Sequence, residues 1–168
     1  LSERDSYYAR TLRESDWYQQ NFGVSISAEQ GAKVNFDNTS MGGMSAISVT
    51  GATTGFRGDL LLLDDAHNIS DGESDAKRSE AVGWFQEVFQ TRVNDLDNTP
   101  IVVIGQRVHE DDVYNAALEL GYTHLNIAME YDPEIAKTTS IGWTDPRTVE
   151  GELMWPERFS ADAVERLK

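Results

Sequence analysis

The chain has 168 residues, a length that suits one domain with a sizeable core. Its 14 basic and 29 acidic residues give a net charge of -15, which excludes a broad contact with a phosphate backbone and leaves only contacts that are local, metal-mediated or made by another part or subunit. The absence of cysteine excludes disulfides and thiolate metal sites, and no apolar run reaches the roughly 18 residues that span a membrane.

The N-terminal part predicts a helix followed by short strands. Residues 1–22 contain neither Gly nor Pro, and we expect their aromatic stripe to face the core rather than to stack on bases. The strands expected next are Lys33–Phe36 and Ser45–Val49, separated by turn residues at 38–40 and by Gly42–Gly43. A glycine-rich loop, Gly51–Gly58, then leads to the most informative part of the chain.

The stretch Asp59–Asp65 reads DLLLLDD and predicts the central strand. Four consecutive leucines indicate a strand buried on both faces, and two carboxylates end it. In nucleoside triphosphatases with a phosphate-binding loop, such a strand is a Walker B motif, whose first carboxylate helps to hold Mg²⁺ while the next orients or deprotonates the attacking water. By this interpretation Asp64 serves the metal and Asp65 the water. The alternative is a buried strand that ends in a solvated acidic turn.

The remaining chain alternates helices and strands. Residues 74–93 predict a helix with one apolar face, capped by Ser70 or Asp71. A second buried strand is expected at Ile101–Ile104, followed by a helix over 111–120, a strand over Thr123–Ala128 and a helix after Ser160. This order predicts an α/β fold with a mainly parallel central sheet and flanking helices.

Polar residues also follow the strand expected at Ile101–Ile104. If this strand lies beside the Asp59–Asp65 strand, the side chains of Gln106 and Arg107 converge with those of Asp64 and Asp65. A polar side chain in this place can sense a γ-phosphate. The alternative is a loop residue paired with the acidic run Glu110–Asp112.

One arginine precedes the acidic strand on the glycine-rich loop. Arg57 can reach a neighbouring subunit's nucleotide as an arginine finger. It can equally be solvated or paired with Asp59. Both interpretations stay open from the sequence.

The three histidines do not complete the metal site of a metallohydrolase. Asp64, Asp65 and His67 could begin the ligand set of a metallohydrolase, but His109 and His124 supply no recognisable second set. We therefore give this chemistry little weight.

Several segments occur in an order that carries a resemblance. They are TGFRGDLLLLDDAHN, then Ser74–Arg78 leading to Trp84-Phe85, Thr91-Arg92, IVVIGQRVHEDDV and DPRTVEGELMWPERF, preceded by Trp17-Tyr18 and a strand with glycine turn at Phe36–Asn38. Together they resemble the ATPase domain of large terminase subunits from tailed bacteriophages. The resemblance covers residues from about Tyr7 to Lys168.

The resemblance implies a RecA-like fragment, of the ASCE class of P-loop NTPases, from a motor that hydrolyses ATP to push double-stranded DNA into a procapsid. Asp64 matches the Walker B aspartate that holds Mg²⁺, and Asp65 has the position of the catalytic acid, where many terminases have glutamate. Gln106 and Arg107 fall in the segment that resembles the coupling motif, and Arg57 lies where related motors carry a loop arginine proposed to act in trans. The implied partners are the portal protein, the small terminase subunit and further copies in a ring, in the host cytoplasm.

Two departures limit what the chain can do by itself. It contains no G-x-x-x-x-G-K-[ST] sequence, so the loop that cradles the phosphates is not among these residues, and we expect the family's nuclease domain to lie outside them too. The chain also starts at Leu1 rather than at methionine. We expect residues 1–168 to be a single domain, the Walker B-containing part of the ATPase domain, which alone binds nucleotide poorly and cleaves nothing.

Two other functions remain open. A non-catalytic interaction domain of a phage or mobile element could keep the NTPase fold while its acidic surface docks on a partner. A generic helicase-like ATPase would predict strand unwinding. A phosphate-binding loop in the reading frame before Leu1 would favour the motor.

Overall fold

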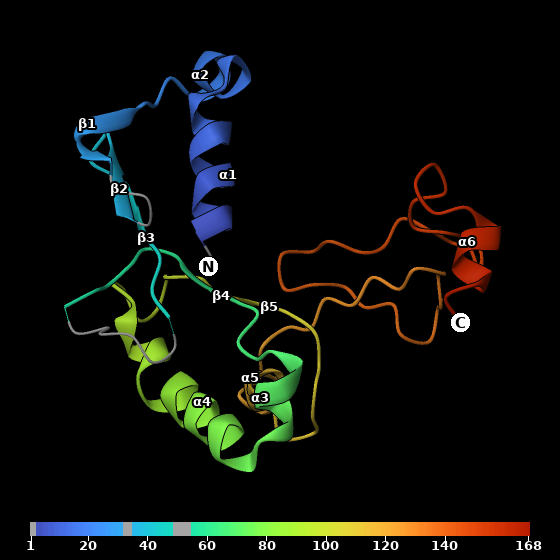
Figure 1. Cartoon of the computed structure of the whole chain (residues 1–168). Helices are drawn as coiled ribbons and strands as arrows, with labels where there is room; N and C mark the ends of the chain where they lie inside the picture. The colour runs from blue at the N-terminus through green and yellow to red at the C-terminus, as the bar shows by residue number, and fades with distance from the viewer. Residues whose placement is uncertain (1–2, 32–34, 49–54) are drawn as a thin grey trace. The chain divides into compact units, whose positions relative to one another are not determined.

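The computed structural model describes residues 3–31, 35–48 and 55–168 and mixes helices with strands (Figure 1). The chain divides into two compact units, Leu1–Ala116 and Ala117–Lys168. Two compact units can still belong to one domain, so the expectation that residues 1–168 form a single domain stays a prediction. Among the described residues, none of the helices is long and apolar enough to cross a membrane.

The predicted N-terminal helix is divided into α1 (Glu3–Glu14) and α2 (Asp16–Phe22). The break lies at Ser15, whose hydroxyl accepts the Tyr18 N–H at 3.3 Å and so caps α2. The expectation that the aromatic stripe faces a core is wrong, because the side chains of Tyr7 and Trp17 are 63% and 59% exposed. The rings contact one another instead, as Trp17 does with Phe22 at a centroid distance of 5.9 Å.

The first sheet is antiparallel, with the order β1 (Ile26–Gly31), β2 (Asn35–Asn38) and β3 (Gly43–Ser45). The sequence did not predict β1. The strand expected at Lys33–Phe36 corresponds to β2, although residues 33 and 34 lie outside the described chain. The strand expected at Ser45–Val49 overlaps β3 only at Ser45, where β3 ends, and Val49 lies outside the described residues. Phe36 of β2 is 1% exposed and lies under the Arg13 guanidinium at 4.8 Å.

The second sheet pairs β4 (Leu61–Asp64) with β5 (Ile101–Ile104) in parallel, from Leu61 opposite Ile101 to Asp64 opposite Ile104 (Figure 1). The parallel pair agrees with the predicted mixed α/β class. The expectation that β4 is buried on both faces is wrong, because Leu63 is 6% exposed whereas Leu62 is 40% exposed. Successive side chains of a strand point to opposite faces, and in the described chain only one face of this pair is covered well.

The connection between these strands contains α3 (Ile69–Glu73), α4 (Asp75–Glu87) and the 3-10 helix η1 (Phe89–Arg92). The predicted apolar face is confirmed, since Ala81, Phe85 and Phe89 are buried. The expected caps are wrong, because Ser70 and Asp71 lie inside α3, a helix that the sequence did not predict. The N-cap of α3 is Asn68, whose Oδ1 accepts the Asp71 N–H at 2.8 Å.

The helix predicted over 111–120 is confirmed as α5 (Val113–Glu119). Its Tyr114 is buried and reaches the ends of both strands of the parallel pair. The Tyr114 hydroxyl accepts the Ala66 N–H at 3.1 Å and lies against the backbone of Gly105, which has φ of 155°. No side chain fits at Gly105, because a Cβ there would overlap the Tyr114 hydroxyl.

The second unit has little regular structure. The strand expected at Thr123–Ala128 is wrong, since these residues are irregular, and an isolated bridge joins Glu130 to Leu153 instead. The final helix after Ser160 is confirmed as α6 (Ala161–Glu165), with Ser160 as its N-cap. Short apolar runs form strands only where a partner strand is available, which local sequence does not reveal.

Arg147 connects the irregular segments of the second unit. Its guanidinium pairs with Asp145 at 2.6 Å and donates to the carbonyls of Ala128 at 2.9 Å and Glu152 at 2.9 Å. It also lies 5.5 Å from the Tyr131 ring centroid. The planar fork of arginine can make all these contacts at once, whereas a lysine ammonium cannot.

We predict that replacing Gly105 by alanine destabilises the first unit by about 1–3 kcal/mol, because the new methyl group displaces Tyr114. Gly83→Ala is the matched control. Gly83 lies within α4 with open space around the position of a Cβ, so alanine there should stabilise by about 0.5–1 kcal/mol. Urea unfolding of the two variants measures both changes, and equal stabilities would contradict the close contact at Gly105.

We predict that Arg147→Lys opens the second unit locally, because lysine cannot replace the contacts to Asp145 and to both carbonyls. Amide hydrogen exchange at Tyr131 and Gly151, which donate to the opposite chain segment, should become about tenfold faster or more. Arg166→Lys is the control, because Arg166 is exposed at the end of α6. Unchanged exchange in Arg147→Lys would show that charge alone holds these segments.

Candidate functional site

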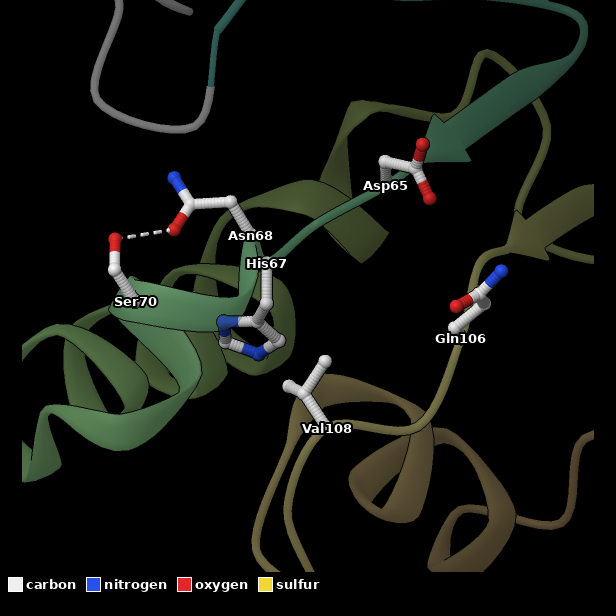
Figure 2. A pocket seen from close by; sticks show the side chains of 6 residues that line it. All are labelled: Asp65, His67, Asn68, Ser70, Gln106 and Val108. Atoms are coloured by element: carbon white, nitrogen blue, oxygen red, sulfur yellow. Dashed lines mark hydrogen bonds between the residues drawn. The ribbon is translucent and has the colours of Figure 1, made fainter.

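The parallel pairing of β4 and β5 brings their C-terminal residues to one edge of the sheet. Asp64 is opposite Ile104, and the Asp65 N–H continues the ladder by donating to the Ile104 carbonyl at 3.1 Å. Asp65 and Gln106 therefore emerge from neighbouring strands, as Figure 2 shows. The sequence predicted this convergence on the condition that the strands are neighbours, and that condition is met.

A pocket of about 570 Å³ lies at this edge. This volume falls in the range of small-molecule sites. Its lining combines residues that follow β4 with residues that follow β5: Asp65, His67, Asn68, Ser70, Gln106 and Val108 (Figure 2). Two of the sequence-predicted site residues thus border one cavity.

Asp65 has an unusual backbone conformation. Its φ is 45°, in the left-handed region that residues other than glycine rarely adopt. Strain of this kind costs on the order of 1–3 kcal/mol and occurs preferentially at functional sites. The turn sets the direction of the Asp65 carboxylate relative to Asp64, which is still part of the strand.

Arg107 does not border the pocket but folds back onto its own loop. Its Nε lies 3.0 Å from a carboxylate oxygen of Asp112, and its Nη2 donates to the carbonyls of His109 and Glu110, both at 3.2 Å. This is the pairing with the acidic run that the sequence left open as an alternative. A role of Arg107 toward a phosphate stays a prediction.

The Asp112 carboxylate organises the loop between β5 and α5. It is 0% exposed, and it accepts the N–H groups of Val108 at 3.0 Å, His109 at 3.3 Å and Asn115 at 2.9 Å. Burial would raise the pKa of this carboxyl, but these N–H groups together with the Arg107 guanidinium outweigh burial and lower it. Asp112 is therefore ionised at neutral pH and acts as the N-cap of α5.

Two hydrogen bonds join α5 to the segment that follows β4. The Val113 N–H donates to His67 Nε2 at 3.1 Å, and the Ala66 N–H donates to the Tyr114 hydroxyl at 3.1 Å. Burial raises the pKa of the Tyr114 hydroxyl, and the negative charge of Asp65 adds to the increase, so the hydroxyl is neutral. The pocket is thus built against the start of α5.

Arg57 lies beside the other end of the strand pair. Its Nη1 donates to the Val93 carbonyl at 3.0 Å, although the residue as a whole is exposed. Asp59, the predicted alternative partner, accepts from the Asn94 side chain at 2.7 Å. An action of Arg57 on a neighbouring subunit stays a prediction.

Asp64 and Asp65, the magnesium ligand and catalytic acid that the sequence predicts, lie at the C-terminal end of β4. Within the described residues, no group of three or more His, Asp or Glu side chains is arranged to hold a metal. Mg²⁺ does not require such a group, because it is usually bound by one or two carboxylates, several waters and the phosphates of its ligand. Asp64, half-buried, and Asp65, exposed, are adjacent and offer oxygen ligands of this kind.

Sequence reasoning missed several residues of this site. His67 was considered only as a metal ligand and Asp112 only as part of the acidic run, and neither Asn68 nor the buried Tyr114 was singled out. The N-cap pattern of Asn68 before a short helix was a usable signal. The contacts of Tyr114 had no local signal, because they join residues 48 positions apart.

The sequence matches no protein-family model, and a search of curated proteins gives no match. The assignment of a function therefore depends on the residues themselves.

We predict that Asp112→Asn destabilises the first unit by about 2–4 kcal/mol, because the amide nitrogen would face buried N–H donors and Arg107 would lose its partner. Asp111→Asn, at an exposed neighbouring carboxylate, should change stability by less than about 0.5 kcal/mol. Urea unfolding at pH 7 measures both.

The difference in unfolding free energy between wild type and Asp112→Asn should depend on pH. Because the folded-state pKa of Asp112 is lowered, its stabilisation is complete above the unfolded value near 4 and is lost as the pH falls through the folded value. The stability difference between wild type and Asp112→Asn should therefore shrink below about pH 4. A difference that grows on acidification would contradict an ionised Asp112.

Proposed function

We propose that this chain contributes the Walker B part of an ATPase that drives double-stranded DNA into a phage procapsid, as in the large terminase subunits it resembles. One observation supports the ATPase most directly. Parallel, in-register pairing brings Asp64, Asp65 and Gln106 to one strand edge, where a pocket of about 570 Å³ is bordered by Asp65 and Gln106. In open α/β sheets, ligands bind at the carboxyl ends of the strands.

Each residue has a distinct task in this proposal. Asp64, at the last position of β4, would hold the Mg²⁺ of Mg·ATP. That ion, when bound, neutralises charge on the phosphates during in-line attack by water. Asp65, the residue that follows β4 and borders the pocket, orients the water and takes up its proton. Gln106, an uncharged hydrogen-bonding group on the neighbouring strand's loop, contacts the γ-phosphate.

The remaining parts of the proposal concern assembly. A ring of copies would let Arg57 of one subunit approach the nucleotide of the next. With a net charge of -15, the chain leaves the grip on DNA to other segments. The portal protein and the small terminase subunit are the partners that belong to this function, in the host cytoplasm.

We predict that Asp65→Asn lowers ATP turnover by the full-length gene product by ~100-fold or more, because an amide cannot accept the proton of the attacking water. Turnover is measured with and without linear double-stranded DNA. Asp97→Asn is the control, since Asp97 is an exposed carboxylate in the turn before β5, at the opposite end of the strand pair. That variant should retain wild-type turnover.

The other outcomes separate the competing functions. Equal turnover in wild type and Asp65→Asn would assign the catalytic role to another residue. No turnover in either protein would favour the non-catalytic docking domain. Unwinding of duplex DNA by the wild type would favour a helicase-like ATPase.

A further inference from the structure

One ring nitrogen of His67 has no hydrogen-bond partner within the described part of the chain. The side chain is 6% exposed and borders the pocket, and its Nε2 accepts the Val113 N–H at 3.1 Å. A neutral imidazole has one proton, so acceptance at Nε2 places that proton on Nδ1. His67 thus has an N–H donor at Nδ1.

His67 is one of the residues that line the pocket, although only 6% of it is exposed. Figure 2 shows the ring between Ser70 and Val108.

The polar groups beside His67 already bond to one another. Asn68 Oδ1 accepts from the Ser70 hydroxyl at 2.8 Å and from the Asp71 N–H at 2.8 Å, and Asn68 Nδ2 donates to the Asp71 carboxylate at 2.7 Å. These bonds form the start of α3 and do not need a ligand. His67 differs because its donor is held in place by α5 and its hydrogen bond is still to be made.

We propose that His67 binds the ligand of this pocket by donating from Nδ1 to a phosphate oxygen. The inference rests on the proposed function, which supplies the phosphate as the ligand class. A phosphate oxygen is a charged acceptor, and hydrogen bonds to charged acceptors are about twice as strong as neutral ones. The Val113 N–H has a definite part in this arrangement, because it fixes the tautomer that presents Nδ1–H to the ligand.

Two substitutions separate the two edges of the ring. His67→Gln places an amide near the position of Nε2, where its oxygen can accept the Val113 N–H, but leaves no donor at the position of Nδ1. His67→Asn places an amide near Nδ1, where it can donate to the ligand, but leaves Val113 without its acceptor. A ligand contact and a purely structural contact therefore predict opposite orders of affinity.

The measurement is the dissociation constant of the full-length gene product for a non-hydrolysable ATP analogue with Mg²⁺, by titration calorimetry. We expect His67→Gln to weaken binding about 10- to 100-fold and His67→Asn to stay within about threefold of wild type. Wild-type affinity in His67→Gln would overturn the role of His67 and leave the proposed ATPase intact. Absence of binding by the wild type would overturn the proposed ATPase and this inference with it.

A second measurement tests the tautomer in the 168-residue chain without nucleotide. Long-range ¹H–¹⁵N correlation spectra at pH 7.5 should show His67 protonated at Nδ1 and unprotonated at Nε2. A ring protonated at Nε2 could not accept the Val113 N–H, and this result would overturn the inference whatever the affinities are.

Discussion

The buried carboxylate of Asp112 is the constraint on which the candidate site depends. An ionised group with no exposed surface is tolerated only when its oxygens are fully used, and here backbone N–H groups on both sides of the residue supply the hydrogen bonds. Because Val108 and Asn115 bond to the same side chain, the loop after β5 and the start of α5 have one fixed arrangement. Val113 and Tyr114 are thereby placed where they meet the segment after β4.

The parallel pair of strands supplies the second constraint. Its register sets Asp64 level with Ile104, so the residues that follow each strand leave the sheet at the same height. Tyr114 lies against both exits and leaves no room for a side chain at Gly105. The loops that border the pocket are thus fixed by two buried side chains, the Tyr114 ring and the Asp112 carboxylate. This arrangement favours a preformed site.

The alternation of exposure in the strand pair also has a consequence. Leu62, Val102 and Ile104 are each at least 40% exposed, whereas Leu63 is buried. A run of apolar residues is typical of a strand covered on both faces, but the covering must come from other elements. The apolar sequence is suited to burial on both faces of the strand pair. Within the described residues, only one face is buried.

The sequence by itself determined the apolar strands, the amphipathic face of α4, the existence of α5 and α6 and the position of acidic residues at a strand end, because these depend on local periodicity and on short-range turn chemistry. It also identified Asp65 and Gln106, which the structure places at one pocket. Only the tertiary structure decided that Arg107 pairs with Asp112, that His67 and Tyr114 contact the opposite segment and that residues 123–128 form no strand. Each of these outcomes depends on which hydrogen-bond partner or neighbouring strand a residue finds. Those partners are distant in the sequence and come together only in the folded chain.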